Sequence, residues 1–438
     1  MSGVTLALVG FAVMLLLIAA RMPVGLSMLL TGSAGYVYLS SWSAFVAYMK
    51  TNPYHQFANY TLSVIPLFIL MGALAERSGL STALFRAAAA VVGRRPGGLA
   101  MAVIGACTGF GAICGSSVAT TATFGRAALP ELRRYGYDGG FSSGTIAVGG
   151  TLGILIPPSV ILVVYAISTE QNIAKLFEAA IIPGLLAATF YCIAIALIVR
   201  RRPELAPVAD LDIGSRGALL MQVWPVLLVA LVVVGGIYGG IFTPTEGAAF
   251  GAISMLLVGL LQRTLGWADI AASLRQTAET SGMIFIILLG SEVFDAFLAL
   301  SRLPSIAAET IGGSGLPPYA ILISLMAFYI LLGAVMDELA MLLLTLPVFF
   351  PIVQALDFGL PAEEVAIWFG ILVLIVVGIG LTCPPIGLNV FVVSSIARDI
   401  PIASTYRGVL PYVGMDIIRL GLVIAFPALA LWTVRLLN

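Results

Sequence analysis

The chain has 438 residues, of which 60% are hydrophobic and only 10% charged, and its formal net charge is zero. Soluble proteins carry about a quarter charged residues because their surfaces face water, so this composition excludes an ordinary soluble protein and indicates a surface that faces lipid. The zero net charge argues neither for nor against a nucleic-acid partner, and we expect none.

Long apolar runs predict that the chain crosses the bilayer as helices. In lipid every backbone N–H and C=O must be satisfied within the protein, which leaves helices or a closed barrel. Runs such as 4–20 and 219–241 are close to the length of a spanning helix, and they lack the alternation at every second residue that barrel strands show. No basic residue precedes the first run, so we expect a retained helix rather than a cleaved signal peptide.

The first half, residues 1–199, is expected to contain five crossings and one hairpin. An apolar region at about 97–131 is interrupted by Gly115-Ser116-Ser117, which predicts a re-entrant helical hairpin. A later helix, about 141–169, is broken over 149–158, where it contains Pro157-Pro158. Helices are also expected at about 3–20, 22–40, 62–76 and 172–198, with a less hydrophobic stretch at 41–60 and an amphipathic segment at 80–93.

A polar linker at 200–217, expected to be cytoplasmic, separates this half from a second one at 218–438, where the same order recurs. The second half has an apolar region at about 317–354, interrupted around Asp337-Glu338, and a helix broken over 378–385. Gly153-Ile-Leu-Ile-Pro157-Pro158 and Gly380-Leu-Thr-Cys-Pro384-Pro385 match at both ends. The remaining helices are expected at about 219–241, 244–262, 280–299 and 409–435, with an amphipathic segment at 267–278.

The arginines support this topology. If each interrupted region is a hairpin that enters and leaves on one side, each half crosses five times and the second half is inverted. With both termini in the periplasm, only four basic residues then lie outside, which is the asymmetry of the positive-inside rule. These four are Lys50, Lys175, Arg302 and Arg435. The basic residues expected inside are Arg21, Arg77, Arg86, Arg94, Arg95, Arg126, Arg133, Arg134, Arg200, Arg201, Arg202, Arg216, Arg263, Arg275, Arg398 and Arg407.

We therefore expect an all-α polytopic membrane protein made of two inverted repeats, each with five crossings and a re-entrant helical hairpin. Inverted repeats with discontinuous helices are typical of secondary transporters. Unwound backbone at membrane depth is tolerated where it lines a cavity or holds an ion, and half-helix N-termini suit an anionic substrate. Glycine and hydroxyl residues can also serve only close helix packing, as in Gly149xxxGly153. The presence of two matched pairs of breaks favours a role in binding an ion or substrate over a role in helix packing alone.

Acidic residues in apolar spans are candidates for function because an ionised group is costly there. Asp337 lies at the interruption of the second hairpin, which favours a functional role. Glu246 follows Thr243-Pro244-Thr245 at a helix start, where capping is the better interpretation. For Glu292, Asp295 and Asp416, placement near the membrane interface and function remain open alternatives.

Five motifs resemble one known family, the large membrane subunit (M) of tripartite ATP-independent periplasmic (TRAP) transporters, over essentially the whole chain. They are Ile65-Pro-Leu-Phe-Ile-Leu-Met-Gly72, Gly115-Ser-Ser-Val-Ala-Thr-Thr121, Gly153-Ile-Leu-Ile-Pro-Pro-Ser159, Gly240-Ile-Phe-Thr-Pro-Thr-Glu246 and Gly380-Leu-Thr-Cys-Pro-Pro385. The resemblance implies an elevator-type carrier of the ion transporter superfamily in a bacterial inner membrane, driven by a sodium gradient. It also implies two separate partners, a small four-helix membrane subunit (Q) and a periplasmic substrate-binding protein (P), and organic-acid substrates such as C4-dicarboxylates or sialic acid.

The family pattern implies two or more Na⁺ sites and no other cofactor. One site would join the first hairpin tip to the first broken helix, and a second would join Asp337 to the second broken helix, with substrate between the tips. The second tip lacks the hydroxyls of the first, so backbone carbonyls are the expected ligands there, and protons could replace Na⁺ if Asp337 or Glu338 titrates. The candidate Na⁺ ligands are Ser116, Ser117, Gly149, Thr151, Gly153, Asp337, Gly378, Gly380 and Thr382. The candidate substrate residues are Ser116, Ser117, Thr120, Asp337, Pro158 and Pro385.

Two other classes are less well supported. An intramembrane enzyme would need a base, and the single histidine, His55, falls in an expected external stretch, so we expect no enzyme. A channel would favour a continuous polar pore rather than paired hairpins. A carrier that acts without partners, or one coupled to protons, remains an alternative. The four cysteines lie singly in apolar stretches and are expected to be small buried side chains rather than metal ligands.

Overall fold

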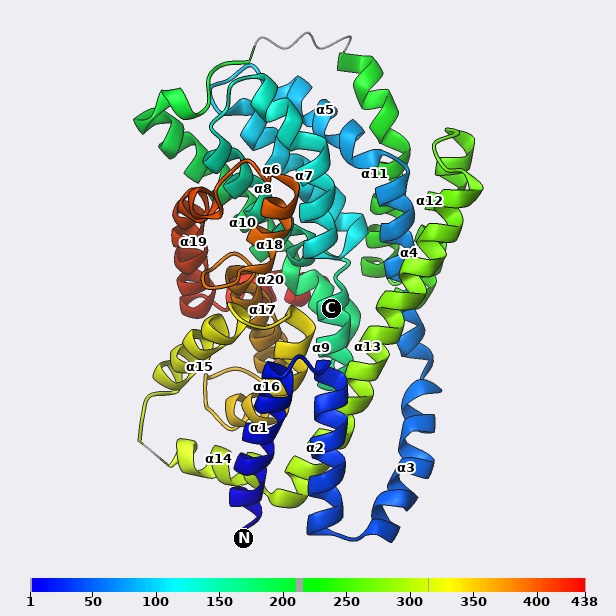
Figure 1. Cartoon of the computed structure of the whole chain (residues 1–438), viewed down its shortest axis with the longest axis vertical. Coiled ribbons are helices and arrows are strands. Elements are labelled where there is room, and N and C mark those ends of the chain that lie inside the picture. The colour runs from blue at the N-terminus through cyan, green and yellow to red at the C-terminus, as the bar shows by residue number, and fades with distance from the viewer. Residues whose placement is uncertain (1, 210–215, 314, 438) are drawn as a thin grey trace.

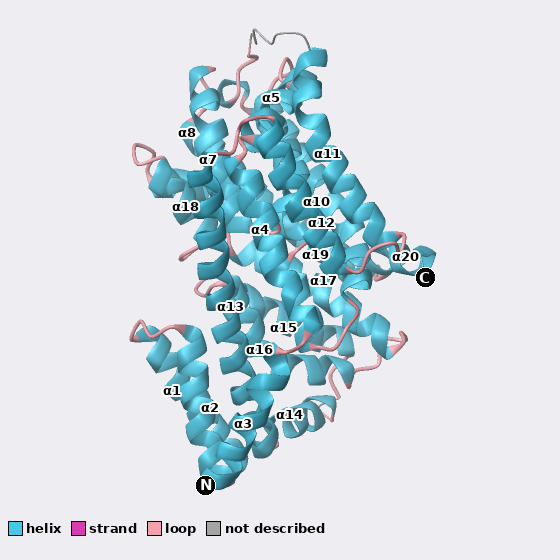
Figure 2. Ribbon diagram, turned by 90° about the vertical axis from the view of Figure 1, so that its right-hand side faces the viewer, coloured by secondary structure: helices cyan, strands magenta, loops and turns pink. Residues whose placement is uncertain are grey.

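The computed structural model describes residues 2–209, 216–313 and 315–437. Within these ranges every regular element is a helix and no strand occurs (Figure 2). The molecule is elongated, with α1, α2, α3 and α14 at one end and α5, α7 and the start of α8 toward the other (Figures 1 and 2).

The first half contains ten α-helices and a short 3-10 turn, Tyr60–Ser63, that leads into α4. A second 3-10 turn, Pro203–Leu205, follows α10. The helices are α1 (Gly3–Ala19), α2 (Val24–Leu39), α3 (Trp42–Phe57), α4 (Val64–Arg77), α5 (Leu80–Val92), α6 (Gly98–Cys114), α7 (Ser117–Arg134), α8 (Gly139–Leu155), α9 (Val160–Ser168) and α10 (Ile173–Arg201).

The described part of the second half repeats this order, except in α13 and at the end of the chain. Its helices are α11 (Arg216–Tyr238), α12 (Pro244–Leu261), α13 (Trp267–Ser301), α14 (Leu303–Gly312), α15 (Pro318–Gly333), α16 (Glu338–Gln354), α17 (Ala362–Gly380), α18 (Leu388–Ile396), α19 (Ile402–Ala425) and α20 (Ala428–Leu437). The expected hairpins correspond to α6–α7 and α15–α16, and the expected broken helices correspond to α8–α9 and α17–α18.

Six of the described helical stretches are long and apolar enough to cross a bilayer, and α8 with α9, bent by 43° at their break, makes a seventh. Eight other described stretches, among them α1, α2, α6 and α16, are apolar but only 10–17 residues long. The expected all-helical, multi-pass architecture is confirmed. The six helical stretches that are long enough to cross a bilayer are residues 60–77, α10, α12, α13, α17 and α19.

Helix boundaries differ from the expectation in α13 and at the chain end. The amphipathic segment and the following span form one 35-residue helix, α13. No proline interrupts it, and the Thr277 hydroxyl finds its partner within the helix by donating to the Ser273 carbonyl at 2.8 Å. The last span is divided between Phe426 and Pro427, because proline lacks an N–H and its ring disfavours helical backbone in the preceding residue.

A lateral group of helices, which we call the frame, consists of α1–α4 and α11–α13. Its tightest crossings are α2 on α13 and α4 on α12. Lipid removes the hydrophobic force between helices, so association there depends on close contact of small residues. A Cβ added to Gly32 would stand 2.8 Å from the Phe294 backbone, and one added to Gly290 would overlap the Gly25 carbonyl. The frame is therefore held by backbone-to-backbone packing.

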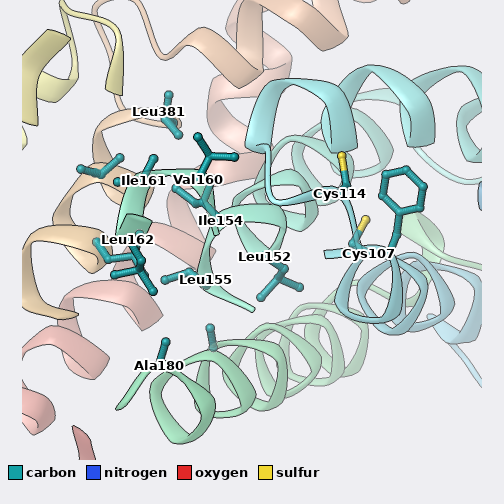
Figure 3. Close-up of a cluster of buried hydrophobic side chains, with 14 of the residues drawn as sticks. Cys107, Cys114, Leu152, Ile154, Leu155, Val160, Ile161, Leu162, Ala180 and Leu381 are labelled. Carbon is teal, nitrogen blue, oxygen red and sulfur yellow. The ribbon is translucent and has the colours of Figure 1, made fainter. Parts of the chain in front are cut away.

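The hairpins and broken helices form the second group, which we call the hairpin core (α6–α9 and α15–α18), flanked by α10 and α19. Figure 3 shows apolar side chains of α8 and α9 packed beside Cys107 and Cys114 of α6. Both cysteines are buried free thiols, as expected for small apolar side chains, whereas Cys192 and Cys383 are free thiols that are only partly buried. Along α17 nearly every side chain is buried, and Trp368 donates to the Val423 carbonyl of α19 at 2.9 Å.

The α2–α13 crossing yields a stability prediction. Gly290→Ala places a methyl group against the backbone of α2, and overpacking of this kind costs about 1–3 kcal/mol, so the melting temperature of the purified protein should fall. Gly282→Ala is the matched control because it lies on the same helix with nothing within 4 Å, and it should be neutral or slightly stabilising. Equal melting temperatures for both variants would contradict the packing role of Gly290.

Candidate functional site

The tip of the first hairpin lies directly against the first broken helix. Gly115 ends α6 with φ of 63°, a left-handed conformation that glycine adopts without strain, and Ser116 caps α7 by accepting the Ala119 N–H at 3.4 Å. A Cβ on Gly115 would stand 2.9 Å from the Pro158 carbonyl oxygen. The tip therefore needs glycine both for its turn and for its approach to the break.

Two glycines on one face of α8 let α7 pack at the same depth. A Cβ on Gly150 would overlap the Thr121 hydroxyl, and a Cβ on Gly153 would overlap the Thr120 hydroxyl. Thr120 itself donates to the Ser116 carbonyl at 2.7 Å. The sequence placed the tip beside 149–153, and the structure brings Ser116, Thr120 and Gly153 together there.

Asn389 of α18 joins this contact from the other half of the chain. Its Nδ2 donates to Ser117 Oγ at 2.7 Å and to the Ala147 carbonyl at 3.0 Å. Its Oδ1 and the Thr121 hydroxyl are buried and have no hydrogen-bond partner among the described residues. Ser117, Thr121 and Asn389 are each fully buried. Unpartnered buried oxygens of this kind call for an explanation such as a bound ion or water.

Sequence reasoning missed Asn389. Its signal is a single carboxamide within the otherwise apolar run 388–393, four residues after Pro385. At the equivalent position after Pro158 the first half has Leu162, so the match between the halves gave no reason to select it. Polar residues inside apolar spans are uncommon and mark sites by default, which is the rule that would have found it.

The other two candidates on α8 face different neighbours. A Cβ on Gly149 would stand 3.0 Å from Cys107 Sγ of α6. The Thr151 hydroxyl donates to the Val148 carbonyl at 2.7 Å and lies 3.1 Å from the Tyr191 hydroxyl. The Cα–Cβ direction of Gly149 and the side chain of Thr151 therefore face neighbours other than Ser117 and Asn389, although both residues belong to the same turn of α8.

Behind Thr151 lies a buried polar network. Tyr191 donates to Asp416 Oδ2 at 2.7 Å, and Asp416 forms an ion pair with Arg419 at 2.8 Å. Arg419 is completely buried and also donates to the Pro183 carbonyl at 3.4 Å. Asp416 is thus buried inside the protein with both a donor and a cation beside it. The network ties α10 and α19 to the break in α8.

The second hairpin tip lies against the second broken helix in a related way. Gly333 at the end of α15 packs on Gly380, where a Cβ would stand 2.6 Å from the Gly333 carbonyl carbon. The Ala334 carbonyl accepts the Ile386 N–H at 3.1 Å, which satisfies unwound backbone on both sides. Asp337 caps α16, its Oδ2 accepting from the Leu339 and Ala340 amides at 3.1 and 3.3 Å.

The remaining candidates near this break are buried in backbone contacts. Thr382 is fully buried and donates to the Ile379 carbonyl at 3.0 Å. A Cβ on Gly378 would lie 3.7 Å from Thr151, so the two broken helices meet at this point.

Glu246 caps α12 reciprocally with Thr243, which confirms the capping interpretation.

A cavity of about 470 Å³ lies between the two hairpin tips and the frame. Ser116, Asp337 and Glu338 line it from the tips, and Glu76 of α4 and Gln276 of α13 line it from the frame. Glu76 pairs across it with Arg126 of α7 at 2.8 Å. Glu76 and Gln276 lie near the ends of their helices that carry Arg77 and Arg275, so the cavity extends toward the arginine-rich end.

Not every predicted substrate residue reaches this cavity. Ser117 and Thr120 are fully buried behind the first tip. Pro158 is buried beside Gly115, and Pro385 is exposed with its carbonyl accepting from Tyr406 at 3.1 Å. Ser116 and Asp337 are the predicted substrate residues that line the space.

Comparison with known proteins identifies the family. Residues 11–429 match the family described as the DctM component of tripartite ATP-independent periplasmic transporters. The C4-dicarboxylate TRAP transporter large permease protein DctM of Pseudomonas aeruginosa is 35% identical over 85% of this chain and 86% of that protein. The isethionate TRAP transporter permease protein DctMQ of Oleidesulfovibrio alaskensis is 30% identical over 97% of this chain and 65% of that protein.

The fold also has a solved counterpart. The crystal structure of the Alcanivorax borkumensis YdaH transporter, reported to have an unusual topology, matches with a TM-score of 0.63 over 88% of this chain and 90% of that chain. At 16% identity this likeness concerns the fold alone. The sequence relatives are permease proteins rather than enzymes, in line with the expectation from the residues. The chain belongs to the DctM family of TRAP transporter large membrane subunits.

Proposed function

We propose that this chain imports an organic acid anion across the bacterial inner membrane, coupled to Na⁺ and supplied by a periplasmic substrate-binding protein. The observation that carries the proposal is the meeting of both hairpin tips at one cavity, with unpartnered buried oxygens directly behind the first tip. Relatives named for C4-dicarboxylate and for isethionate support an organic acid as substrate.

The first Na⁺ site is assigned to the contact of Ser117, Thr121 and Asn389. Hard cations take oxygen ligands, and this contact offers hydroxyl and carboxamide oxygens, two of them without a partner among the described residues. Carbonyls of the adjacent α8 turn, at Gly149–Gly153, supply further oxygen. The second site is assigned to Asp337 at the second tip and Gly378–Thr382 at the end of α17, which the contact of Gly333 with Gly380 brings to the same tip.

The charges around the cavity favour coupling to cations. Three carboxylates line it, from Glu76, Asp337 and Glu338, against one guanidinium, from Arg126. Two like charges 4 Å apart repel by about 4 kcal/mol at an effective dielectric constant near 20. An anion therefore needs cations beside the tips to enter, which makes its binding depend on Na⁺.

The elevator mechanism is part of the same proposal. The frame consists of tightly packed helices, whereas the hairpin core carries both tips and both breaks. The Glu76–Arg126 ion pair spans the two groups at the edge of the cavity. The Arg126 side chain is 59% exposed and that of Glu76 19%, and a partly exposed ion pair adds little stability, so this pair can break and reform at small cost. Movement of the hairpin core along the frame would carry the site between the two sides.

The first prediction concerns Na⁺ affinity. Ser117→Ala removes a proposed ligand and should raise the Na⁺ concentration for half-maximal uptake by about tenfold, equal to roughly 1.4 kcal/mol. Uptake is measured in proteoliposomes that contain the chain with its small subunit and binding protein. Ser324→Ala is the control, because that exposed serine bonds only within α15. An unchanged Na⁺ dependence in Ser117→Ala would refute the site, and uptake driven by a proton gradient without Na⁺ would refute the coupling ion.

The second prediction separates two roles of Asp337. Asparagine caps helices about as well as aspartate, so Asp337→Asn retains the cap of α16 and removes the charge. We expect Asp337→Asn and Asp337→Ala both to lose at least about tenfold in uptake rate, while only the alanine variant loses about 1 kcal/mol of stability. Wild-type uptake by the asparagine variant would limit Asp337 to capping.

The third prediction concerns the partners. The DctMQ relative is about half as long again as the matched region, and its name joins the M and Q components, which supports a small membrane subunit beside this chain. The chain alone in proteoliposomes should transport at a small fraction of the rate of the complete system. Equal rates with and without the small subunit and binding protein would favour the carrier that acts without partners.

A further inference from the structure

A second cavity, of about 510 Å³, lies at the arginine-rich end of the molecule, away from the hairpin tips. It is enclosed by the start of α8, the end of α10 and the start of α19. Three arginines line it, Arg201 and Arg202 from α10 and Arg407 from α19, together with Ser404. Its position on the spanning helices α10 and α19 places it where the positive-inside rule puts the cytoplasmic lipid headgroups.

Glycines fix one wall of the cavity, because they let α8 and α19 pack backbone against backbone. A Cβ on Gly408 of α19 would overlap the Gly140 carbonyl of α8, and a Cβ on Gly144 would stand 2.6 Å from the Gly408 carbonyl carbon. The third side is closed because the Asp138 amide donates to the Leu205 carbonyl after α10 at 2.9 Å. The cavity walls are thus fixed by backbone contacts.

The cavity carries an excess of positive charge. Among the described residues Asp138 is the one carboxylate in the lining, and it caps α8 by accepting the Phe141 amide at 2.8 Å. Arg133, at the same end, is paired: it holds Asp399 at 2.8 Å and lowers the pKa of that carboxyl through the hydrogen bond. Within residues 2–209, 216–313 and 315–437, neither Arg201, Arg202 nor Arg407 forms an ion pair.

The chemistry of the cavity matches a phosphate group next to acyl chains. Guanidinium groups bind phosphate through paired hydrogen bonds and are the preferred side chain for it. Ile198 and Pro411 form apolar walls, and the lipid-facing Leu197 and Leu410 lie one residue away from them with 44% and 58% exposure. Basic pockets between spanning helices on the cytoplasmic side bind anionic lipid headgroups.

We propose that this arginine cavity, formed by Arg201, Arg202, Arg407 and Ser404, binds the phosphate headgroup of an anionic phospholipid. The site is separate from the proposed transport site, since its lining shares no residue with the cavity between the hairpin tips. A lipid held there ties the end of α10 and the start of α19 to the start of α8.

The experiment measures lipid binding by native mass spectrometry of the purified chain titrated with phosphatidylglycerol or phosphatidylcholine. We expect phosphatidylglycerol to bind about tenfold more tightly than phosphatidylcholine, and Arg201→Gln/Arg407→Gln to remove that preference. Arg200→Gln is the matched control, because Arg200 is an exposed arginine on the same helix outside the cavity lining, and it should bind as the wild type does.

Three outcomes would overturn the proposal: equal affinity for the two lipids, equal loss in Arg200→Gln and the double variant, or displacement of the lipid by millimolar inorganic phosphate. The last would identify a free anion as the occupant. If the double variant does not fold, Arg407→Gln alone and Arg407→Lys take its place. Lysine keeps the charge without the paired donors, so its affinity for phosphatidylglycerol should lie between those of Arg407→Gln and the wild type.

Discussion

Unwound backbone at membrane depth must find hydrogen-bond partners inside the protein, and this requirement organises the hairpin core. Each hairpin tip lies against a broken helix, so that the exposed amides and carbonyls of one meet those of the other. Around the second tip the Ala334 carbonyl takes the Ile386 amide, and around the first the Gly115 carbonyl takes the Val160 amide at 3.5 Å. Contacts this close are possible only where side chains are missing, which is why glycine recurs at both tips.

The same packing decides which groups remain free. Once the tip of the first hairpin is seated on Gly150 and Gly153, the hydroxyls of Thr120 and Thr121 have little room to turn. Thr120 satisfies itself on the Ser116 carbonyl, whereas Thr121 does not find a partner among the described residues. A cation site of the kind proposed here is thus a consequence of helix packing, with no ligand placed on a flexible loop.

Much of this arrangement could be read from the sequence, because it depends on residues with strong backbone preferences. The helix breaks are indicated by Gly115, by the Pro157-Pro158 pair and by its counterpart Pro384-Pro385. Because the same order of hairpin and broken helix occurs in both halves, each tip could be matched to a broken helix. Glu246 was assigned to a cap because its local spacing suffices for that contact. Helix caps and helix breaks of this kind depend on residues within about one helical turn of each other, which a local sequence pattern can reveal.

What could not be read depends on contacts between distant segments. Asn389 reaches Ser117 across 272 residues, and Tyr191 reaches Asp416 across 225, and no local pattern specifies either pair. The continuity of α13 was missed for a different reason. A change from amphipathic to apolar character resembles a boundary, but without a proline or a competing cap the helix has no cause to end there.

The two halves repeat a backbone and diverge in chemistry, and this difference bears on how the proposed carrier works. The first tip carries Ser116 and Ser117, which are neutral, while the second carries Asp337 and Glu338, two carboxyl groups that line the cavity. A cation at the first tip would be held by neutral oxygens and retain its full charge toward an incoming anion. A cation at the second would first neutralise a carboxylate. The first site would therefore attract the substrate and the second would remove a repulsion, so both must be filled before an anion binds well. The repeated backbone would set the positions of the two proposed ions, and the different side chains would give those ions different roles.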